Sequence, residues 1–204
     1  YSKSRVEALM AEGDHAKNLV LDLRGNGGGT VVSMCHLLGY FMAPEKPVGT
    51  FVSKKLVKDF VSETNGKTTD LVKIAAWSPK KVYPQAIKKE LFAGNLAVLI
   101  NNNSGSASEI ATQALRETLN VPVVGEKSAG KVLVSVLAQL PHGYQLQYPI
   151  TDFVSVNGIR LEGSGIAPDI TAKDPRVMRP GVMDEPLQKA VALLHRAQLR
   201  QERY

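Results

Sequence analysis

Residues 18–29 read NLVLDLRGNGGG, the pattern of a buried strand that runs directly into a glycine-rich turn. After the turn, Val31, Met34, Leu38 and Phe41 recur at the spacing of one face of a helix. A strand, a glycine turn and a helix in this order form the basic unit of an α/β layered fold. The stretch therefore predicts that fold class for the chain.

A second unit of the same kind follows further along the chain. Residues 96–100, LAVLI, predict another buried strand, and the polar residues 101–105 separate it from a helix running from Ser106 to about Leu119. Residues 121–125, VPVVG, predict a third strand. The inner face of the helix is expected to carry Ile110, Ala111, Ala114 and Leu115.

Between these units, apolar residues alternate from Val48 to Trp77, with Asn65 and Gly66 between two such runs. Asn-Gly tolerates the left-handed backbone that a tight hairpin requires. We therefore expect a protruding β-hairpin inserted into the layered core, acting as a lid or a dimer contact.

The remaining segments predict two helices and two strands. A short amphipathic helix around Val6 should end near Gly13, and residues 132–140 and 144–156 should form strands. Asp184 is expected to cap a final helix. Its buried stripe would be Leu187, Ala190, Val191 and Leu194.

Composition narrows the function classes. The 204 residues are 44% hydrophobic and 22% charged, which indicates one folded domain over residues 1–204. The net charge is +6, but the basic residues are scattered rather than gathered in a stripe, so nucleic acid is not expected as a partner. Cys35 is the single cysteine and lies on the apolar stripe of its predicted helix, which favours a buried thiol.

No apolar run is long enough for a membrane span, and the sequence begins at Tyr1 without a leader. We interpret it as a fragment whose upstream part would have carried any targeting signal. The four histidines have no metal-ligand spacing, so neither a metal nor another cofactor is expected. A Ser–His triad stays open.

Ser106 lies where a strand's carboxyl end turns into a helix, so its hydroxyl would be exposed at the edge of the sheet. The free N–H groups of the first helical turn there favour developing negative charge. The alternative is that Ser106 only caps the helix, with Glu109 completing a capping box. The two roles compete for the same hydroxyl. Ser104 or Ser108 could cap in its place.

Lys131 follows Ser106 by 25 residues and is the candidate general base. A free lysine has a pKa near 10.4, so only about one molecule in 2,500 is neutral at pH 7. Burial could lower that pKa by about three units, and Gly130 and Val132 would allow an enclosed site. The alternative is an ordinary surface lysine at the start of a strand.

The glycine turn could supply backbone amides to an oxyanion, together with the amide of Ala107. It lacks both the Lys-Ser/Thr of a P-loop and the spacing of a dinucleotide fingerprint. Asp22, Arg24 and Asn26 are expected to hold the turn by hydrogen bonds. Serine, lysine and amides together suggest hydrolysis of peptide bonds through an acyl-enzyme.

Four segments together resemble the carboxy-terminal processing, or tail-specific, serine peptidases that use a Ser–Lys dyad. They are residues 21–29, LDLRGNGGG; residues 106–110, SASEI; residues 125–131, GEKSAGK; and residues 157–170, NGIRLEGSGIAPDI. The last is similar to the family's Gly-x-Gly-Ile-x-Pro-Asp signature. The resemblance runs in order from about Val6 to Leu194.

The resemblance implies a core related to the ClpP/crotonase type, with Ser106 as nucleophile and Lys131 as base. Ala107 and Gly28 would be the oxyanion donors. The implied substrates are proteins or peptides, unfolded or tagged at the C-terminus. An oligomer is compatible with the resemblance, and a periplasmic, cell-envelope or secreted location is expected.

The chain departs from the family in two ways. Many members have Gly after the lysine and a Gln four residues beyond it, which orients the lysine; here Val132 and Ser135 stand at those positions. A PDZ module, which captures the substrate tail in many members, would lie upstream. The rival functions are a non-catalytic binding module of apolar ligands or peptides from the same superfamily and an acyl-CoA enzyme on the crotonase fold. A third alternative is an inactive or zymogen-like peptidase, whose dyad Ser135 and the missing upstream part leave misaligned.

Overall fold

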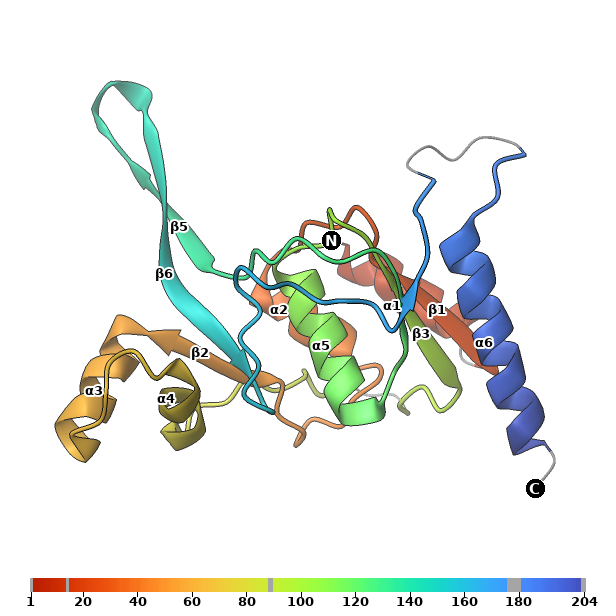
Figure 1. Ribbon diagram of the computed structural model, residues 1–204, viewed down its shortest axis with the longest axis horizontal. Coiled ribbons are helices and arrows are strands. Elements are labelled where there is room, and N and C mark those ends of the chain that lie inside the picture. The colour runs from red at the N-terminus through yellow and green to blue at the C-terminus, as the bar shows by residue number, and fades with distance from the viewer. Residues whose placement is uncertain (1, 14, 88–89, 176–180, 203–204) are drawn as a thin grey trace.

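A computed structural model describes residues 2–13, 15–87, 90–175 and 181–202 (Figure 1). A parallel sheet and an antiparallel sheet lie side by side, each with helices packed on it. In chain order, the elements are α1 (Lys3–Glu12), β1 (Asn18–Asp22), α2 (Val31–Leu38), β2 (Gly49–Ser53), α3 (Lys54–Thr64), α4 (Leu71–Trp77), β3 (Asn95–Ile100), α5 (Ala107–Leu119), β4 (Val123–Gly125), β5 (Val134–Gln139), a 3₁₀ turn (Pro141–Gly143), β6 (Gln145–Ser155), β7 (Ile170–Thr171) and α6 (Glu185–Gln201).

The parallel sheet has the strand order β1-β3-β4-β7 and is covered on both faces. Side chains alternate along β3: Val98 and Ile100 enter the core shared with α2 and α5, whereas Ala97 and Leu99 enter the core shared with α6. A strand buried on both faces has a continuous apolar sequence, as residues 96–100 do. The predicted α/β layered core is confirmed.

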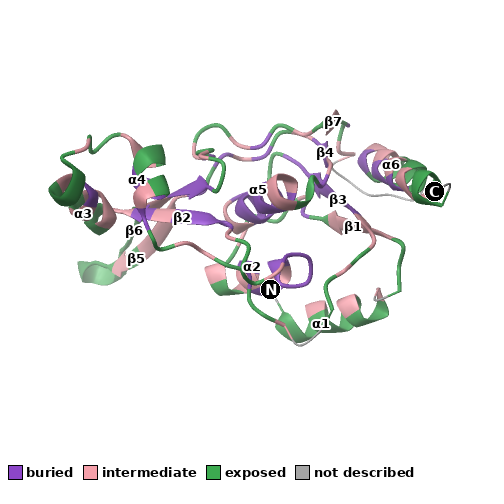
Figure 2. Cartoon of the chain, turned by 90° about the horizontal axis from the view of Figure 1, so that it is seen from below, coloured by how far each residue is buried: buried purple, intermediate pink, exposed green. Residues whose placement is uncertain are grey.

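The two helical layers match the predicted stripes to different degrees. On α5 the whole predicted inner face is buried, whereas on α6 only half of the stripe is (Figure 2). Leu187 and Val191 are 38% and 53% exposed, while Ala190 and Leu194 are buried. Asp184 caps α6 as expected, because its side chain accepts from the Leu187 N–H.

The antiparallel sheet, ordered β2-β6-β5, corrects the expectation of a hairpin between Val48 and Trp77. That segment forms one strand, β2, followed by the two helices α3 and α4. They pack against the sheet around Phe60 and Ile74, and Phe60 meets the Trp77 ring edge-on at 5.5 Å. The insertion is therefore a helix pair.

Asn65 explains the error. It adopts φ 54° and ψ 26° and donates its backbone N–H to Val61 O, which ends α3 with a left-handed cap. A type I′ hairpin turn would use Asn in the same backbone conformation, so Asn-Gly is compatible with a helix C-cap as well as with a hairpin turn.

The protruding hairpin is instead formed by β5 and β6, where the sequence predicts two strands around residues 141–143. It rises away from the body of the molecule (Figure 1). We call residues 134–150 the arm. In the described part of the chain, no helix has the length and apolarity needed to cross a bilayer.

Candidate functional site

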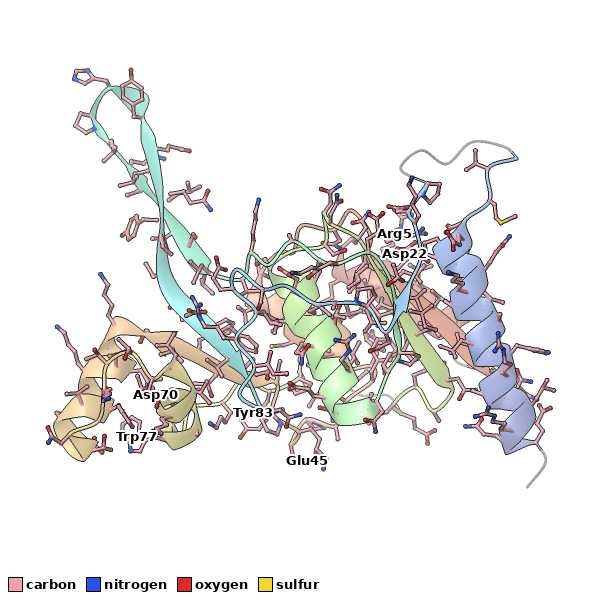
Figure 3. All side chains as sticks on the ribbon, in the orientation of Figure 1. Arg5, Asp22, Glu45, Asp70, Trp77 and Tyr83 are labelled. Atoms are coloured by element: carbon pink, nitrogen blue, oxygen red, sulfur yellow. The ribbon has the colours of Figure 1, made fainter. Side chains whose placement is uncertain are left out.

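Three loops meet at the carboxyl edge of the parallel sheet. They follow β1, β3 and β4, and the carboxyl ends of parallel strands lie at one edge of a sheet. Backbone hydrogen bonds join them: Gly105 N–H donates to Asn26 O at 3.1 Å, and Ser106 N–H donates to Lys131 O at 2.9 Å. Asp22 lies at this edge, far from Asp70 and Trp77 of the helix pair (Figure 3). The predicted site residues therefore belong to neighbouring loops.

Ser106 has a strained backbone. It adopts φ 53° and ψ −122° at the N-cap of α5, whereas the caps Ser2, Thr30 and Ser53 are extended, as capping serines and threonines usually are. Such a conformation costs about 1–3 kcal/mol in a residue other than glycine. The residue is half-buried at the sharp strand-to-helix turn. Strain at such a turn is typical of nucleophile positions.

The capping alternatives are partly resolved. The capping box of Ser106 and Glu109 is formed, and Glu109 Oε2 accepts the Ser106 N–H at 3.0 Å. Ser104 does not cap α5: its hydroxyl donates to Leu23 O and accepts from the Asn101 N–H. Ser108 lies inside the helix and is buried.

The glycine turn lies directly against Ser106. Gly28 has φ +102°, and a Cβ there would stand 2.7 Å from Ser106 Cβ and 2.8 Å from Ala107 N. Only glycine fits so close to the serine. The Gly28 N–H donates to Asn26 Oδ1 at 3.0 Å, so Asn26 holds the turn. The Ala107 N–H belongs to the first helical turn, where amides lack an intrahelical acceptor.

Lys131 corrects the expectation of burial. Its carbonyl oxygen accepts from the Ser106 N–H, but its side chain is exposed, although the neighbouring residues Gly130 and Val132 are buried. The enclosed amine that the sequence suggests is absent from the free chain. The backbone around Lys131 is held firmly, because the amides of residues 130–133 all donate to carboxylates.

Glu109 joins the serine loop to the lysine loop. It is fully buried, and Oε2 accepts from the Lys131 N–H at 2.9 Å as well as from Ser106. Its Oε1 accepts from the Gly130 N–H at 2.7 Å and from the Ser128 hydroxyl. A buried carboxylate is tolerated only when hydrogen-bonded in this way. Glu109 therefore both completes the capping box and links the serine loop to the lysine loop.

Glu162 was not anticipated from the sequence. Its Oε2 accepts from the Val132 and Leu133 amides at 2.8 and 3.1 Å, so it holds the segment after Lys131 as Glu109 holds the segment before it. The surrounding loop is bound to the lysine loop as well, since Gly163 N–H donates to Gly130 O at 2.9 Å. The one sequence signal was its place within the motif of residues 157–170.

Ser135 stands where the family places its glutamine. Its hydroxyl donates to Leu133 O, two residues earlier, at 3.5 Å, beside a register shift between Val134 and Ser135. Glu162 and Glu109, rather than this position, are the polar side chains that hold the lysine loop.

Arg24 ties the glycine turn to the start of α6. It donates two hydrogen bonds of 2.8 Å to the Asp184 carboxylate and further bonds to Asp22, the shortest 2.6 Å. Asp22 and then Asp184 raise the pKa of Arg24. In return, Arg24 holds the pKa of Asp184 below its usual value. Asp22, Arg24 and Asn26 all bond within the turn region.

A small pocket of about 120 Å³ opens beside the serine loop. Gly28 and Ala107 line it together with the apolar side chains of Leu23, Met34 and Leu37. The polar residues Asn26, Thr30, Ser33 and Ser108 line it as well.

His36 and His142 lie outside the serine and lysine loops. His36 lies within α2, with Nε2 3.5 Å from Glu7, and His142 lies at the tip of the arm. Among the described residues, no three histidine, cysteine or acidic side chains are grouped as metal ligands would be.

Comparison with known proteins assigns the family. The profile of peptidase family S41 matches residues 2–172. The chain belongs to this family. "Probable CtpA-like serine protease" of Staphylococcus aureus (strain N315) is 29% identical over 168 residues, which is 82% of this chain and 30% of that protein. The protein of the same name from Staphylococcus haemolyticus is 25% identical over the same share.

Solved structures confirm the S41 fold. A candidate peptidase from Parabacteroides merdae superposes with a TM-score of 0.69 at 23% identity, covering 95% of this chain and 56% of that one. The photosystem II D1 C-terminal processing protease gives a TM-score of 0.62 at 19% identity, covering 93% and 42%. This chain thus spans 30% of the length of the curated relatives named above.

Proposed function

We propose that this chain is the core of a serine endopeptidase that cuts near protein C-termini through an acyl-enzyme. The observation that carries the proposal is the contact of three loops: Ser106, strained and half-buried, lies against Gly28 and is hydrogen-bonded through its backbone to Lys131. The CtpA-like relatives and the D1 processing protease support the C-terminal preference.

In the proposed reaction, Lys131 Nζ accepts the Ser106 hydroxyl proton as Oγ attacks the substrate carbonyl. The Ala107 and Gly28 amides bind the oxyanion, and the Gly28 N–H exchanges Asn26 Oδ1 for it. The lysine then protonates the leaving amine. Lys131 Nζ then deprotonates a water molecule, which attacks the carbonyl of the acyl-enzyme ester. The lysine returns this proton to Ser106 Oγ as the serine leaves.

Lys131 is exposed in the free chain, so the proposal requires the bound substrate to cover its amine. Removing water favours the neutral form of an amine, which is the form that can accept a proton. Glu109 and Glu162 keep the lysine backbone in place before substrate arrives. The proposal predicts activity only when the substrate is long enough to cover this loop.

The proposal for the whole protein is a single catalytic core over residues 1–204, preceded by a PDZ module. We place it outside the cytoplasm, in the periplasm, cell envelope or medium, acting on unfolded or tagged proteins. Oligomerisation is compatible with this role.

The deciding experiment compares Ser106→Ala and Lys131→Ala with the parent on an unfolded protein substrate. Each should lose about 10³-fold or more in kcat while keeping the parent's melting temperature. Lys127→Ala is the matched control, because Lys127 is also exposed and lies in the same loop. A fluorophosphonate probe should label Ser106 in the parent. Full hydrolysis by either variant would end the proposal.

A further inference from the structure

The outer edge of β5 is open. β5 is the last strand of its sheet, and the Leu140 N–H donates to Tyr144 O at 2.8 Å. Hydrogen-bonded and non-bonded pairs alternate along an antiparallel ladder. With Leu137 opposite Gln147 and Gln139 opposite Gln145, the backbone N–H and C=O groups of Leu137 and Gln139 therefore point away from β6.

The opposite edge of the arm is interrupted. β2 pairs with β6 from Thr151 to Ser155, and just beyond it Pro149 lies opposite Ser135, a pair whose backbone groups point outward. Proline has no N–H to donate to an added strand. β5 contains no proline, and residues 132–151 contain no Asp, Glu, Lys or Arg. Charged side chains and prolines are the usual means of blocking a strand edge. The edge of β5 has neither along its whole length, whereas the edge of β6 is interrupted at Pro149 and then covered by β2.

One face of the arm is apolar and unburied. Cross-strand partners share a face, which places Val136 with Tyr148 and Ala138 with Leu146. Tyr144, Leu146 and Tyr148 are 70%, 49% and 42% exposed. The arm stands clear of the rest of the molecule (Figures 1 and 3). It therefore offers an edge for backbone pairing together with an apolar face for side chains.

The open edge leads into the candidate site. β5 begins at Val134, three residues after Lys131, and Glu162 binds the amides of the two residues between them. A strand paired along the six residues of β5 would extend about 20 Å and end beside the lysine and serine loops. Because a strand paired with β5 would end beside the serine and lysine loops, we infer that the occupant is the substrate rather than a second copy of the chain.

We propose that an extended, uncharged stretch of the polypeptide substrate adds to β5 as a new strand, with alternate apolar side chains on the exposed face. The proposal rests on the proposed function, whose substrate class it specifies. Pairing through the backbone tolerates many sequences, as capture of unfolded protein requires. The absence of charge along the arm favours uncharged stretches over acidic or basic ones.

The test measures binding without hydrolysis, so that failure of docking and failure of catalysis give separate results. A fluorescein-labelled twelve-residue peptide alternating valine with glutamine and serine is titrated into the Ser106→Ala chain by anisotropy. Leu137→Pro and Gln139→Pro, added to that chain, each remove one outward N–H. Gln147→Pro is the matched control, since it removes an outward N–H on the opposite edge, directly across from Leu137.

We expect Kd to rise at least tenfold in both β5 variants and to change less than twofold in Gln147→Pro. Leu137→Ala, which keeps the N–H, should also change less than threefold. Hydrogen exchange should show the Leu137 and Gln139 amides protected by the peptide in the Ser106→Ala chain. Equal binding by all variants, or a dimer in sedimentation that Leu137→Pro converts to monomer, would overturn the proposal.

Discussion

The loops at the carboxyl edge of the parallel sheet and the β5–β6 arm treat polar groups in opposite ways. At the loops, two carboxylates take up the amides of residues 130–133, and Glu109 is completely buried while doing so. In the arm, backbone groups of β5 stay open and no charged side chain is present from residue 132 to 151. In the loops, the carboxylates hold the backbone in place through hydrogen bonds. In the arm, the uncharged edge of β5 has backbone groups that can pair with another strand.

Glu109→Ala should have the largest effect on stability, because it removes the carboxylate that holds the loops together. It leaves three donors, on Ser128, Gly130 and Lys131, without their acceptor, and the Ser106 N–H keeps only Lys131 O. Because each unsatisfied buried donor costs about 1–3 kcal/mol and neighbours relax, we expect a loss of about 3–5 kcal/mol in the free energy of unfolding. Urea denaturation followed by circular dichroism measures it.

Two variants control this measurement. Glu109→Gln keeps an acceptor oxygen and should lose less stability than alanine. Glu126→Ala removes a half-buried carboxylate from the same loop and should cost less than about 1 kcal/mol. A loss of under 1 kcal/mol in Glu109→Ala would show that the loops do not depend on this carboxylate.

Gly28→Ala should have the second-largest stability effect and a strong effect on activity. A Cβ there meets Ser106 and Ala107 below 3 Å, and φ +102° disfavours any side chain. We expect about 1–3 kcal/mol of lost stability and about a 100-fold fall in kcat, because the amide donor moves. Gly27→Ala is the control, since a Cβ at Gly27 meets nothing within 4 Å. Equal activity of both variants would show that catalysis does not require glycine at position 28.

Sequence alone predicts the parallel layer well, because its information is local. Strand β3 is buried on both faces, so it has to be an apolar run, and α5 follows it with an apolar stripe at helical spacing. The contact of Gly28 with Ser106 follows from the same topology, since parallel strands bring their loops to one edge. Local pattern and tertiary need agree in this region.

The errors fall where the deciding information is not local. Asn65 ends a helix with the backbone conformation that a hairpin turn would also use. Lys131 has buried neighbours along the chain, yet its side chain is exposed, because enclosure depends on segments far away. Glu162 is 56 residues from Ser106 and acquires its role only once residues 161–166 pack on the lysine loop.

Asp184→Asn should reveal the electrostatic character of the loop region at low pH. Hydrogen bonds from Arg24, and then from the Leu187 N–H, hold the pKa of Asp184 below its ordinary value. Their stabilisation is therefore present above about pH 4 and is lost as pH falls through the lowered pKa. We expect the variant to be about 1–2 kcal/mol less stable at pH 7 and to lose less stability than the parent below pH 4. Parallel pH curves in thermal denaturation would refute this role.

Tyr144→Ala should have the smallest effect on stability and gives the sharpest contrast between the two regions. Tyr144 is 70% exposed on the arm, so truncating it should change the free energy of unfolding by less than about 0.5 kcal/mol. The matched control is Tyr40→Ala, because Tyr40 is 6% exposed in the main core and its loss should cost about 3 kcal/mol or more. Chemical denaturation of both variants measures the difference. A cost above 1 kcal/mol at Tyr144 would mean that the arm is packed against another part of the protein, and its apolar face would then be closed to substrate.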